Sequence, residues 1–120
     1  MRSDGQLVRP KSQDSFAPMG PYLVTVEDIP DPQRLPIRSW VNGKLLQDSN
    51  TNQMIFGVRE LIAYISDGIT LEAGDVISTG TPAWVGEARE QRVFLKLEDE
   101  VVVEIQGVGK LSNSVQASPR

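Results

Sequence analysis

Two residue types are missing from this 120-residue sequence, and each absence excludes a group of functional sites. Without cysteine the chain can form no disulfide and no thiolate site for zinc or an iron–sulfur cluster, which fits a reducing compartment. Without histidine it lacks imidazole metal ligands, the Ser-His and Cys-His nucleophile pairs, and the only side chain that titrates unperturbed near neutral pH. Any acid–base chemistry therefore falls to Asp, Glu, Lys or Tyr.

Positive charge and long apolar runs are also scarce. Lysine and arginine total 12 against 16 Asp and Glu, a net charge of −4, and they are scattered, whereas nucleic-acid binders usually display clustered basic residues. The longest apolar run is far shorter than a bilayer span, and the polar opening at residues 1–5 lacks the apolar stretch of a signal peptide. We therefore expect a soluble, cytoplasmic protein that binds neither nucleic acid nor a membrane.

The length and composition are those of one globular domain. Hydrophobic residues make up 39% and charged residues 23% of the chain, and a chain this long can bury roughly two-thirds of its unfolded surface. We expect a polar N-terminal segment at 1–15, a domain at 16–116 and a tail at 117–120.

Local patterns predict a helix and a hairpin in the middle of the chain. Asn42-Gly43 is a strong two-residue hairpin signal, because both turn positions must tolerate positive φ, and it joins predicted strands at 36–41 and 44–47. Apolar residues at i, i+3, i+4 and i+7 predict a helix over 58–66, closed by Gly68 in a left-handed conformation.

Further strands and one loop complete the predicted layout. The five small polar residues at 48–52 favour a structured loop. β-Branched runs predict strands at 22–26, 76–79, 101–105 and 108–115, the last two forming a hairpin through Gly107. The predicted class is α+β, mainly β, with one central helix.

Two segments are candidates for chemistry. Gly80 and Thr81 place a hydroxyl and bare backbone amides at the end of a predicted strand, which suits a carboxylate or carbonyl oxygen, although an ordinary turn has the same composition. Lys11 precedes the first predicted strand, where an ammonium group beside a concave site can stabilise an enolate, but most lysines in polar segments are only solvated.

Glu98 and Glu100 are the one acidic pair with the spacing of metal ligands. Their alternate positions set two carboxylates on one face of a strand, as a divalent cation requires. They follow Lys96-Leu97 directly before a predicted strand, so a solvated turn is the favoured interpretation. The sequence therefore predicts no metal ligand in this chain.

Several motifs, in order from about residue 5 to 115, resemble those of one family. They are the segments 11–21 (Lys-Ser-x-Asp-x-Phe-Ala-Pro-Met-Gly-Pro), 41–43, 47–51, 54–56, 74–82 (Gly-Asp-Val-Ile-Ser-Thr-Gly-Thr-Pro) and 107–113. Together they resemble the C-terminal part of the fumarylacetoacetate hydrolase family, and within it the bacterial-type acylpyruvate and fumarylpyruvate hydrolases and the hydroxymuconate-pathway isomerase/decarboxylases.

The resemblance implies a mixed β-roll of the fumarylacetoacetate hydrolase C-terminal type, usually a homodimer, that binds Mg²⁺ or Mn²⁺. Such enzymes cleave a C–C bond in a diketo acid, or isomerise or decarboxylate a relative, and the metal stabilises the enolate. Lys11 matches a lysine that contacts substrate and stabilises the enolate. Gly80 and Thr81 match the substrate-contacting loop, and Ser15 matches a position near the cation.

The catalytic metal ligands of the family have no counterpart in this sequence. A Glu-x-Glu pair and an Asp lie upstream of the lysine motif in the family, and a histidine on a lid activates water in its hydrolases. Glu98 and Glu100 align with a turn and do not replace the ligands.

Substitutions beside Thr81 also depart from the family pattern. Trp84 stands where a glycine is usual, so its ring is expected to narrow the substrate site, and Glu87-Ala88 replaces a second glycine pair. Three functional interpretations stay open. The first is the C-terminal part of a divalent-metal-dependent hydrolase that cleaves a C–C bond in a diketo acid. The second is a catalytically inactive, truncated domain that acts only as a folded or partner-binding unit. The third is complementation, in which a separate polypeptide supplies the Glu-x-Glu, Asp and His elements.

Overall fold

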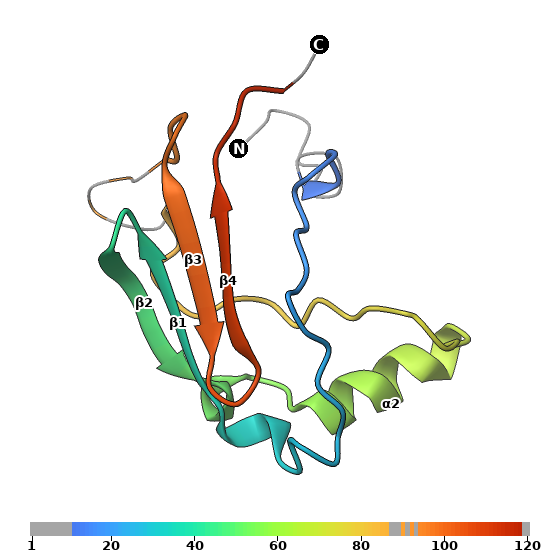
Figure 1. The fold of residues 1–120 in the computed structure, drawn as a ribbon. Coiled ribbons are helices and arrows are strands. Elements are labelled where there is room, and N and C mark those ends of the chain that lie inside the picture. Colours follow the sequence, from blue (N-terminus) through green and yellow to red (C-terminus); the bar gives the residue numbers. More distant parts are fainter. Residues whose placement is uncertain (1–10, 87–89, 91, 93, 119–120) are drawn as a thin grey trace.

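A computed structural model of the chain describes residues 11–86, 90, 92 and 94–118 (Figure 1). Its centre is a four-stranded sheet in the order β2-β1-β3-β4, and each neighbouring pair is antiparallel. One α-helix lies at the foot of the sheet and projects away from it (Figure 1). This arrangement confirms the α+β, mainly β class. The elements are η1 (Pro32–Arg34), β1 (Pro36–Val41), β2 (Lys44–Asn50), η2 (Thr51–Gln53), α2 (Val58–Gly68), β3 (Glu100–Ile105) and β4 (Gly109–Ser114).

Both predicted hairpins are confirmed. Asn42 and Gly43 join β1 to β2 with φ values of 50° and 75°, the positive values that a tight two-residue turn demands. The Asn42 side chain also donates to Asp99 Oδ1 (2.8 Å) and accepts from the Glu100 amide (2.9 Å). The first hairpin turn is therefore attached to Asp99 and to Glu100 at the start of β3, 57 and 58 residues further along the chain.

One face of the sheet carries a row of alternating charges. Because side chains alternate between faces along a strand, Lys110, Glu104, Arg38 and Asp48 line up across all four strands. Lys110 Nζ lies 2.9 Å from Glu104 Oε2, Arg38 Nη1 lies 4.0 Å from Glu104 Oε1, and Arg38 Nε lies 3.0 Å from Asp48 Oδ1. Ser39 lies on the opposite face, where its partner Gln47 contacts residues 82 and 83.

α2 forms where the apolar spacing predicts it, but it ends differently. The helix includes Gly68, and the capping residue is Ile69 with extended backbone (φ −133°), whose amide donates to the Ile65 carbonyl (2.9 Å). The predicted left-handed cap at Gly68 is therefore wrong, because the chain leaves the helix in an extended direction.

Two predicted strands and one loop boundary are also wrong. Residues 22–26 and 76–79 do not join the sheet, and β2 continues to Asn50 instead of ending before a loop at 48. A strand needs a neighbour for its backbone N–H and C=O groups. The described residues provide none for 22–26, where Leu23 is 94% exposed and Val26 78% exposed.

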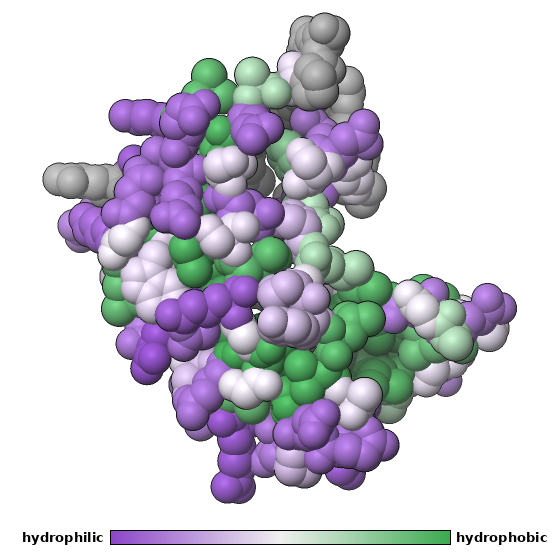
Figure 2. Space-filling view, viewed as in Figure 1, coloured by the Kyte–Doolittle hydropathy of each residue, from purple (hydrophilic) through white to green (hydrophobic). Residues whose placement is uncertain are grey.

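The described residues enclose no buried core. None of them is buried, and the accessible surface of 10341 Å² exceeds by about 60% the area expected for a folded monomer of 13.2 kDa. Apolar residues gather along α2 and at the foot of the sheet (Figure 2), and Phe56 and Ile69 are 55% and 63% exposed.

Among the residues that the structure describes, no helix is both long and apolar enough to span a bilayer.

Candidate substrate-binding loop

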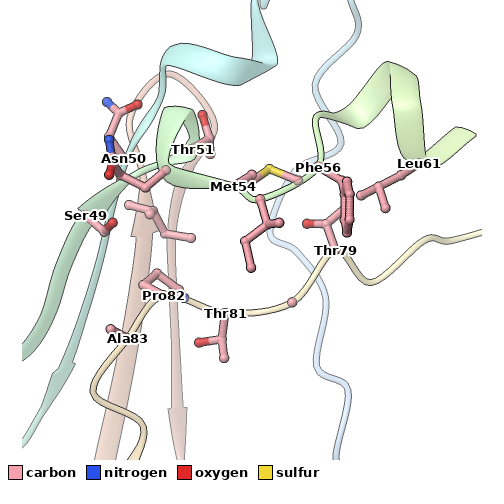
Figure 3. Close-up of a pocket in the computed structure, with 14 residues that line it drawn as sticks. Ser49, Asn50, Thr51, Met54, Phe56, Leu61, Thr79, Thr81, Pro82 and Ala83 are labelled. Atoms are coloured by element: carbon pink, nitrogen blue, oxygen red, sulfur yellow. The ribbon is translucent and has the colours of Figure 1, made fainter.

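An open hollow of about 620 Å³ lies beside the lower end of β2 (Figure 3). Segment 79–83 forms one wall, and the segment from the end of β2 to the first turns of α2 forms the other. The lining is mainly apolar, with hydroxyl and amide groups at the edge. It consists of Ile37, Ser49, Asn50, Thr51, Gln53, Met54, Ile55, Phe56, Leu61, Thr79, Gly80, Thr81, Pro82 and Ala83.

A glutamine on β2 holds the 79–83 wall against the sheet. The two hydrogens of Gln47 Nε2 are shared among three acceptors, which are Thr81 Oγ1 (3.2 Å) and the carbonyl oxygens of Pro82 (3.1 Å) and Ala83 (3.1 Å). The other end of the amide, Oε1, accepts from Ser39 Oγ (2.9 Å) on β1. The loop position is therefore set by side-chain hydrogen bonds across 34 to 36 residues of sequence.

Gly80 has the backbone conformation that glycine tolerates best. Its φ is +101°, and a Cβ at this position would meet no atom within 4 Å. The backbone conformation, not lack of space, therefore favours glycine before Thr81.

Lys11 and Ser15 lie away from this hollow. Both are exposed, and neither is part of its lining. They belong to the first described segment, drawn in blue near the top of Figure 1. Gly80 and Thr81 both line the hollow, and the structure does not bring Lys11 or Ser15 to it.

Trp84 does not narrow the hollow as expected. It is 64% exposed and is not among the lining residues. Its φ is 71°, in the left-handed region where glycine is favoured, which gives a backbone reason for the glycine usual at this place. Glu87 and Ala88 lie outside the described residues.

The acidic segment before β3 forms a turn. Glu98 has a positive φ of 69°, and the Asp99 carboxylate accepts from the backbone amide of Lys96 (2.8 Å) and from Asn42. The hydrogen bond from the Lys96 amide, followed by that from Asn42, lowers the pKa of Asp99 below its ordinary value. Across the described residues, no group of three or more His, Cys, Asp or Glu is placed to hold a metal ion. The described residues therefore offer no set of three such ligands for a divalent cation.

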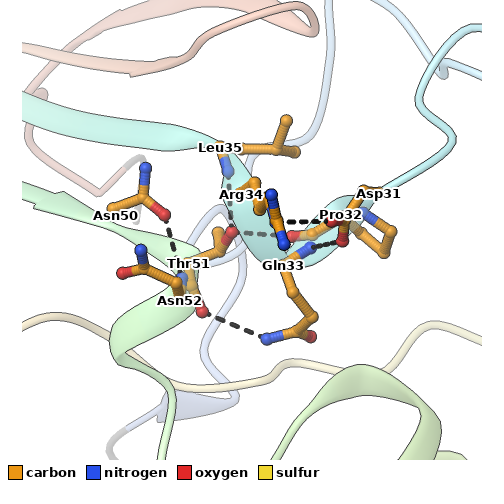
Figure 4. Close-up of polar contacts among 8 residues, drawn as sticks. All are labelled: Asp31, Pro32, Gln33, Arg34, Leu35, Asn50, Thr51 and Asn52. Carbon is orange, nitrogen blue, oxygen red and sulfur yellow. Dashed lines mark hydrogen bonds and ion pairs between the residues drawn. The ribbon is translucent and has the colours of Figure 1, made fainter.

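A second polar cluster fixes the other wall of the hollow (Figure 4). Thr51 Oγ1 accepts from the Leu35 amide (2.9 Å) and donates to the Pro32 carbonyl (2.7 Å). Gln33 Nε2 donates to the Thr51 carbonyl (3.1 Å), and Gln33 Oε1 accepts from the Val58 amide at the start of α2 (2.7 Å). These contacts join η1, η2 and α2.

Sequence reasoning missed Gln33 and Gln47. Gln47 stands in a motif used for the resemblance, but no local pattern shows that its amide reaches residues 81–83. In a regular hairpin through Asn42-Gly43, Leu46 would lie opposite Ser39. Gln47 takes that place only because the register shifts between Ser39 and Trp40, and no local pattern predicts the shift.

The family model described as "Fumarylacetoacetate (FAA) hydrolase C-terminal" matches residues 1–116. The chain belongs to this family. Among curated members, the chain is 48% identical over 115 residues to the mitochondrial oxaloacetate tautomerase Fahd2a of Rattus norvegicus, covering 96% of this chain and 37% of that protein. The chain thus spans well under half the length of the curated relatives it matches.

Solved structures of family members share the fold. Fumarylacetoacetate hydrolase from psychrophilic Exiguobacterium antarcticum superimposes with a TM-score of 0.88 at 44% identity, covering 92% of this chain and 39% of that one. Maleylpyruvate hydrolase from Sphingobium sp. SYK-6, in complex with manganese(II) and pyruvate, gives a TM-score of 0.78 at 33% identity over 93% of this chain and 39% of that one. Metal use is therefore found in the fumarylacetoacetate hydrolase family.

Proposed function

We propose that this chain supplies a substrate-binding wall for an enzyme acting on a small 2-oxo acid. The observation that carries the proposal is the Thr81 hydroxyl, held by Gln47 at the edge of an apolar hollow. The hydroxyl hydrogen donates to a carboxylate or carbonyl oxygen of the substrate, and the apolar walls take its carbon chain.

The proposed reaction is keto–enol conversion of a 2-oxo dicarboxylic acid. A proton leaves the carbon next to the 2-oxo group, the C=O π electrons move to oxygen, and that oxygen takes up a proton. Curated relatives at 47–50% identity named as oxaloacetate tautomerases support this reaction.

A second candidate reaction is hydrolytic C–C cleavage of an acylpyruvate-type or fumarylpyruvate-type diketo acid. Water adds across the bond, so that one fragment leaves as a carboxylic acid and the other as the enol of a 2-oxo acid. The similarity to maleylpyruvate hydrolase supports this cleavage reaction, at identities of 33–34% that are lower than those of the oxaloacetate tautomerases. Both reactions need stabilisation of the negative charge of an enolate. We propose this role for the Lys11 ammonium in the complete site, which requires Lys11 to come to the hollow that it does not line in this structure.

A complete site would also hold Mg²⁺ or Mn²⁺, which would supply Lewis-acid stabilisation of the enolate. Because the described residues contain no fitting ligand set, we propose that its carboxylate ligands come from polypeptide outside those residues. Ser15 is proposed to lie near the cation in that assembled site. The cytoplasmic location also stays a prediction, which cell fractionation would check.

Titration of the ¹⁵N-labelled chain with pyruvate, followed by amide chemical shifts, tests substrate binding. We expect shifts at Gly80, Thr81 and Ala83, and about tenfold weaker binding for Thr81→Val because one hydrogen bond to a charged group is lost. Thr70→Val is the matched control, since Thr70 is exposed and lies outside the hollow. Acetate, which lacks the 2-oxo group, is the ligand control.

Calorimetry with oxalate and Mn²⁺ tests whether the metal ligands come from polypeptide outside the described residues. We expect no Mn²⁺-dependent oxalate binding by this chain alone. Such binding would contradict the assignment of the ligands to other polypeptide. Absence of any pyruvate-induced shift at 79–83 in a folded sample would contradict the proposed function and favour the inactive, partner-binding domain.

A further inference from the structure

We infer that Gln47 is a positioning residue that clamps the 81–83 loop to the sheet and turns the Thr81 hydroxyl into a donor facing the substrate. The role toward substrate rests on the proposed function. The clamp itself is a property of the free chain and is measurable without any ligand.

The orientation of the Gln47 amide follows from its partners. The carbonyl oxygens of Pro82 and Ala83 can only accept hydrogen bonds, so the NH₂ group, not the oxygen, must face them. The oxygen then faces Ser39, whose hydroxyl donates to it. A register shift in the β1–β2 ladder between Ser39 and Trp40 lies beside this pair, and such irregularities re-aim side chains at the edge of a site.

The same geometry decides what Thr81 can do. A threonine hydroxyl carries one hydrogen and two lone pairs. The amide nitrogen cannot accept a hydrogen bond, so in its contact with Thr81 Oγ1 Gln47 Nε2 is the donor, with hydrogens that it shares with the two carbonyl oxygens. The hydroxyl hydrogen therefore stays available for an acceptor outside the loop. A 2-oxo carboxylate is such an acceptor. Without the Gln47 amide, the hydroxyl is free to rotate, and the carbonyl oxygens of Pro82 and Ala83 lose the donor that holds them.

Two substitutions separate the clamp from a general effect on folding. Gln47→Met keeps the length of the side chain and removes its donors. Gln47→Glu keeps an acceptor for Ser39, but at pH 7 it places a carboxylate against two carbonyl oxygens. When protonated, the introduced carboxyl can donate one hydrogen bond, so part of the clamp returns below its pKa, ordinarily about 4.3 for Glu. The control is Gln106→Glu, an exposed glutamine directly after β3.

The measurement is the ¹⁵N heteronuclear NOE of Thr81 and Ala83 between pH 7 and pH 4, with β1 amides as the internal reference. We expect values close to those of β1 in the wild type and in Gln106→Glu, low values in Gln47→Met at every pH, and low values in Gln47→Glu that recover as the pH falls. An ordered loop in Gln47→Met with an intact sheet would overturn the inference, as would a Gln47→Glu profile parallel to that of Gln106→Glu.

A pyruvate titration of the same variants distinguishes this inference from the proposed function. We expect about tenfold weaker binding in Gln47→Met, the effect of a misplaced hydrogen-bond donor. Loop disorder in Gln47→Met, together with no pyruvate binding by the wild type, would support the clamp and overturn the function. Unchanged loop order and unchanged pyruvate affinity in Gln47→Met would overturn the positioning role and leave the proposed function standing.

Discussion

Replacement of Gln33 by methionine tests whether one side chain joins α2 to the rest of the fold. The helix begins after Gly57, which has no side chain to cap it. Gln33 Oε1 takes that place by accepting from the Val58 amide at 2.7 Å, while Nε2 donates to the Thr51 carbonyl at 3.1 Å and contacts Met54 Sδ at 3.7 Å. Gln33 therefore acts as a capping residue that is remote in sequence.

The expected loss follows from these contacts. Removing a helix cap costs about 1 kcal/mol, and removing a neutral hydrogen bond costs a further amount of about 1 kcal/mol. The sulfur contact is long and adds little. Gln33→Met should therefore lower the free energy of unfolding by about 2 kcal/mol. Gln33→Glu keeps the acceptor for Val58 and adds a negative charge at the N-terminus of the helix, but it also places a carboxylate oxygen against the Thr51 carbonyl. The favourable charge at the helix N-terminus offsets part of this repulsion, so the loss should be smaller than for Gln33→Met, about 1 kcal/mol.

Urea unfolding followed by circular dichroism measures these differences in stability. The Leu61 amide donates to the Gly57 carbonyl in the first turn of α2, so faster hydrogen exchange of this amide would show that the loss lies at the start of the helix. Gln106→Met is the matched control. Equal stabilities of Gln33→Met and the wild type within about 0.3 kcal/mol, well below one hydrogen bond, would refute the cap. The expected loss is divided equally between the hydrogen bond to the Val58 amide and the hydrogen bond to the Thr51 carbonyl. A Gln33→Glu variant less stable than Gln33→Met would refute this division, because it keeps the acceptor for Val58.

Three further predictions concern the turn before β3 and the exposed apolar surface. Glu98→Gly should raise the free energy of unfolding by about 1 kcal/mol, since Glu98 has φ +69° and left-handed backbone is costly for residues with a Cβ. Urea unfolding measures this gain, and a loss of stability would contradict the prediction. The pKa of Asp99 is lowered from its ordinary value of 3.8, so its stabilisation is complete above that pH and is lost as the pH falls through the lower folded value. Stability from pH 6 to 2 should therefore fall less in Asp99→Asn, and parallel curves would speak against this contribution. The exposed apolar residues predict self-association, as a homodimer, at micromolar concentration, and a monodisperse monomer in sedimentation velocity would count against it.

Local sequence information determined the elements that need few distant partners. Asn42-Gly43 specifies its turn because both residues tolerate positive φ, and the apolar spacing at 58–65 specifies α2 by the helical repeat. The hairpin of β3 and β4 likewise follows from two β-branched or apolar runs around Gly107. The family resemblance, carried by motifs that span the chain, was also available from the sequence alone.

Tertiary structure alone decided which extended segments are strands and which side chains meet at the site. Residues 22–26 have strand-like composition, but a strand exists only where a neighbour pairs with its backbone, and that neighbour is not encoded locally. In the same way, the amides of Gln47 and Gln33 find acceptors and donors 34 to 36 and 18 to 25 residues away. Local sequence patterns do not predict such contacts, because the path of the chain between two distant residues determines whether their side chains meet.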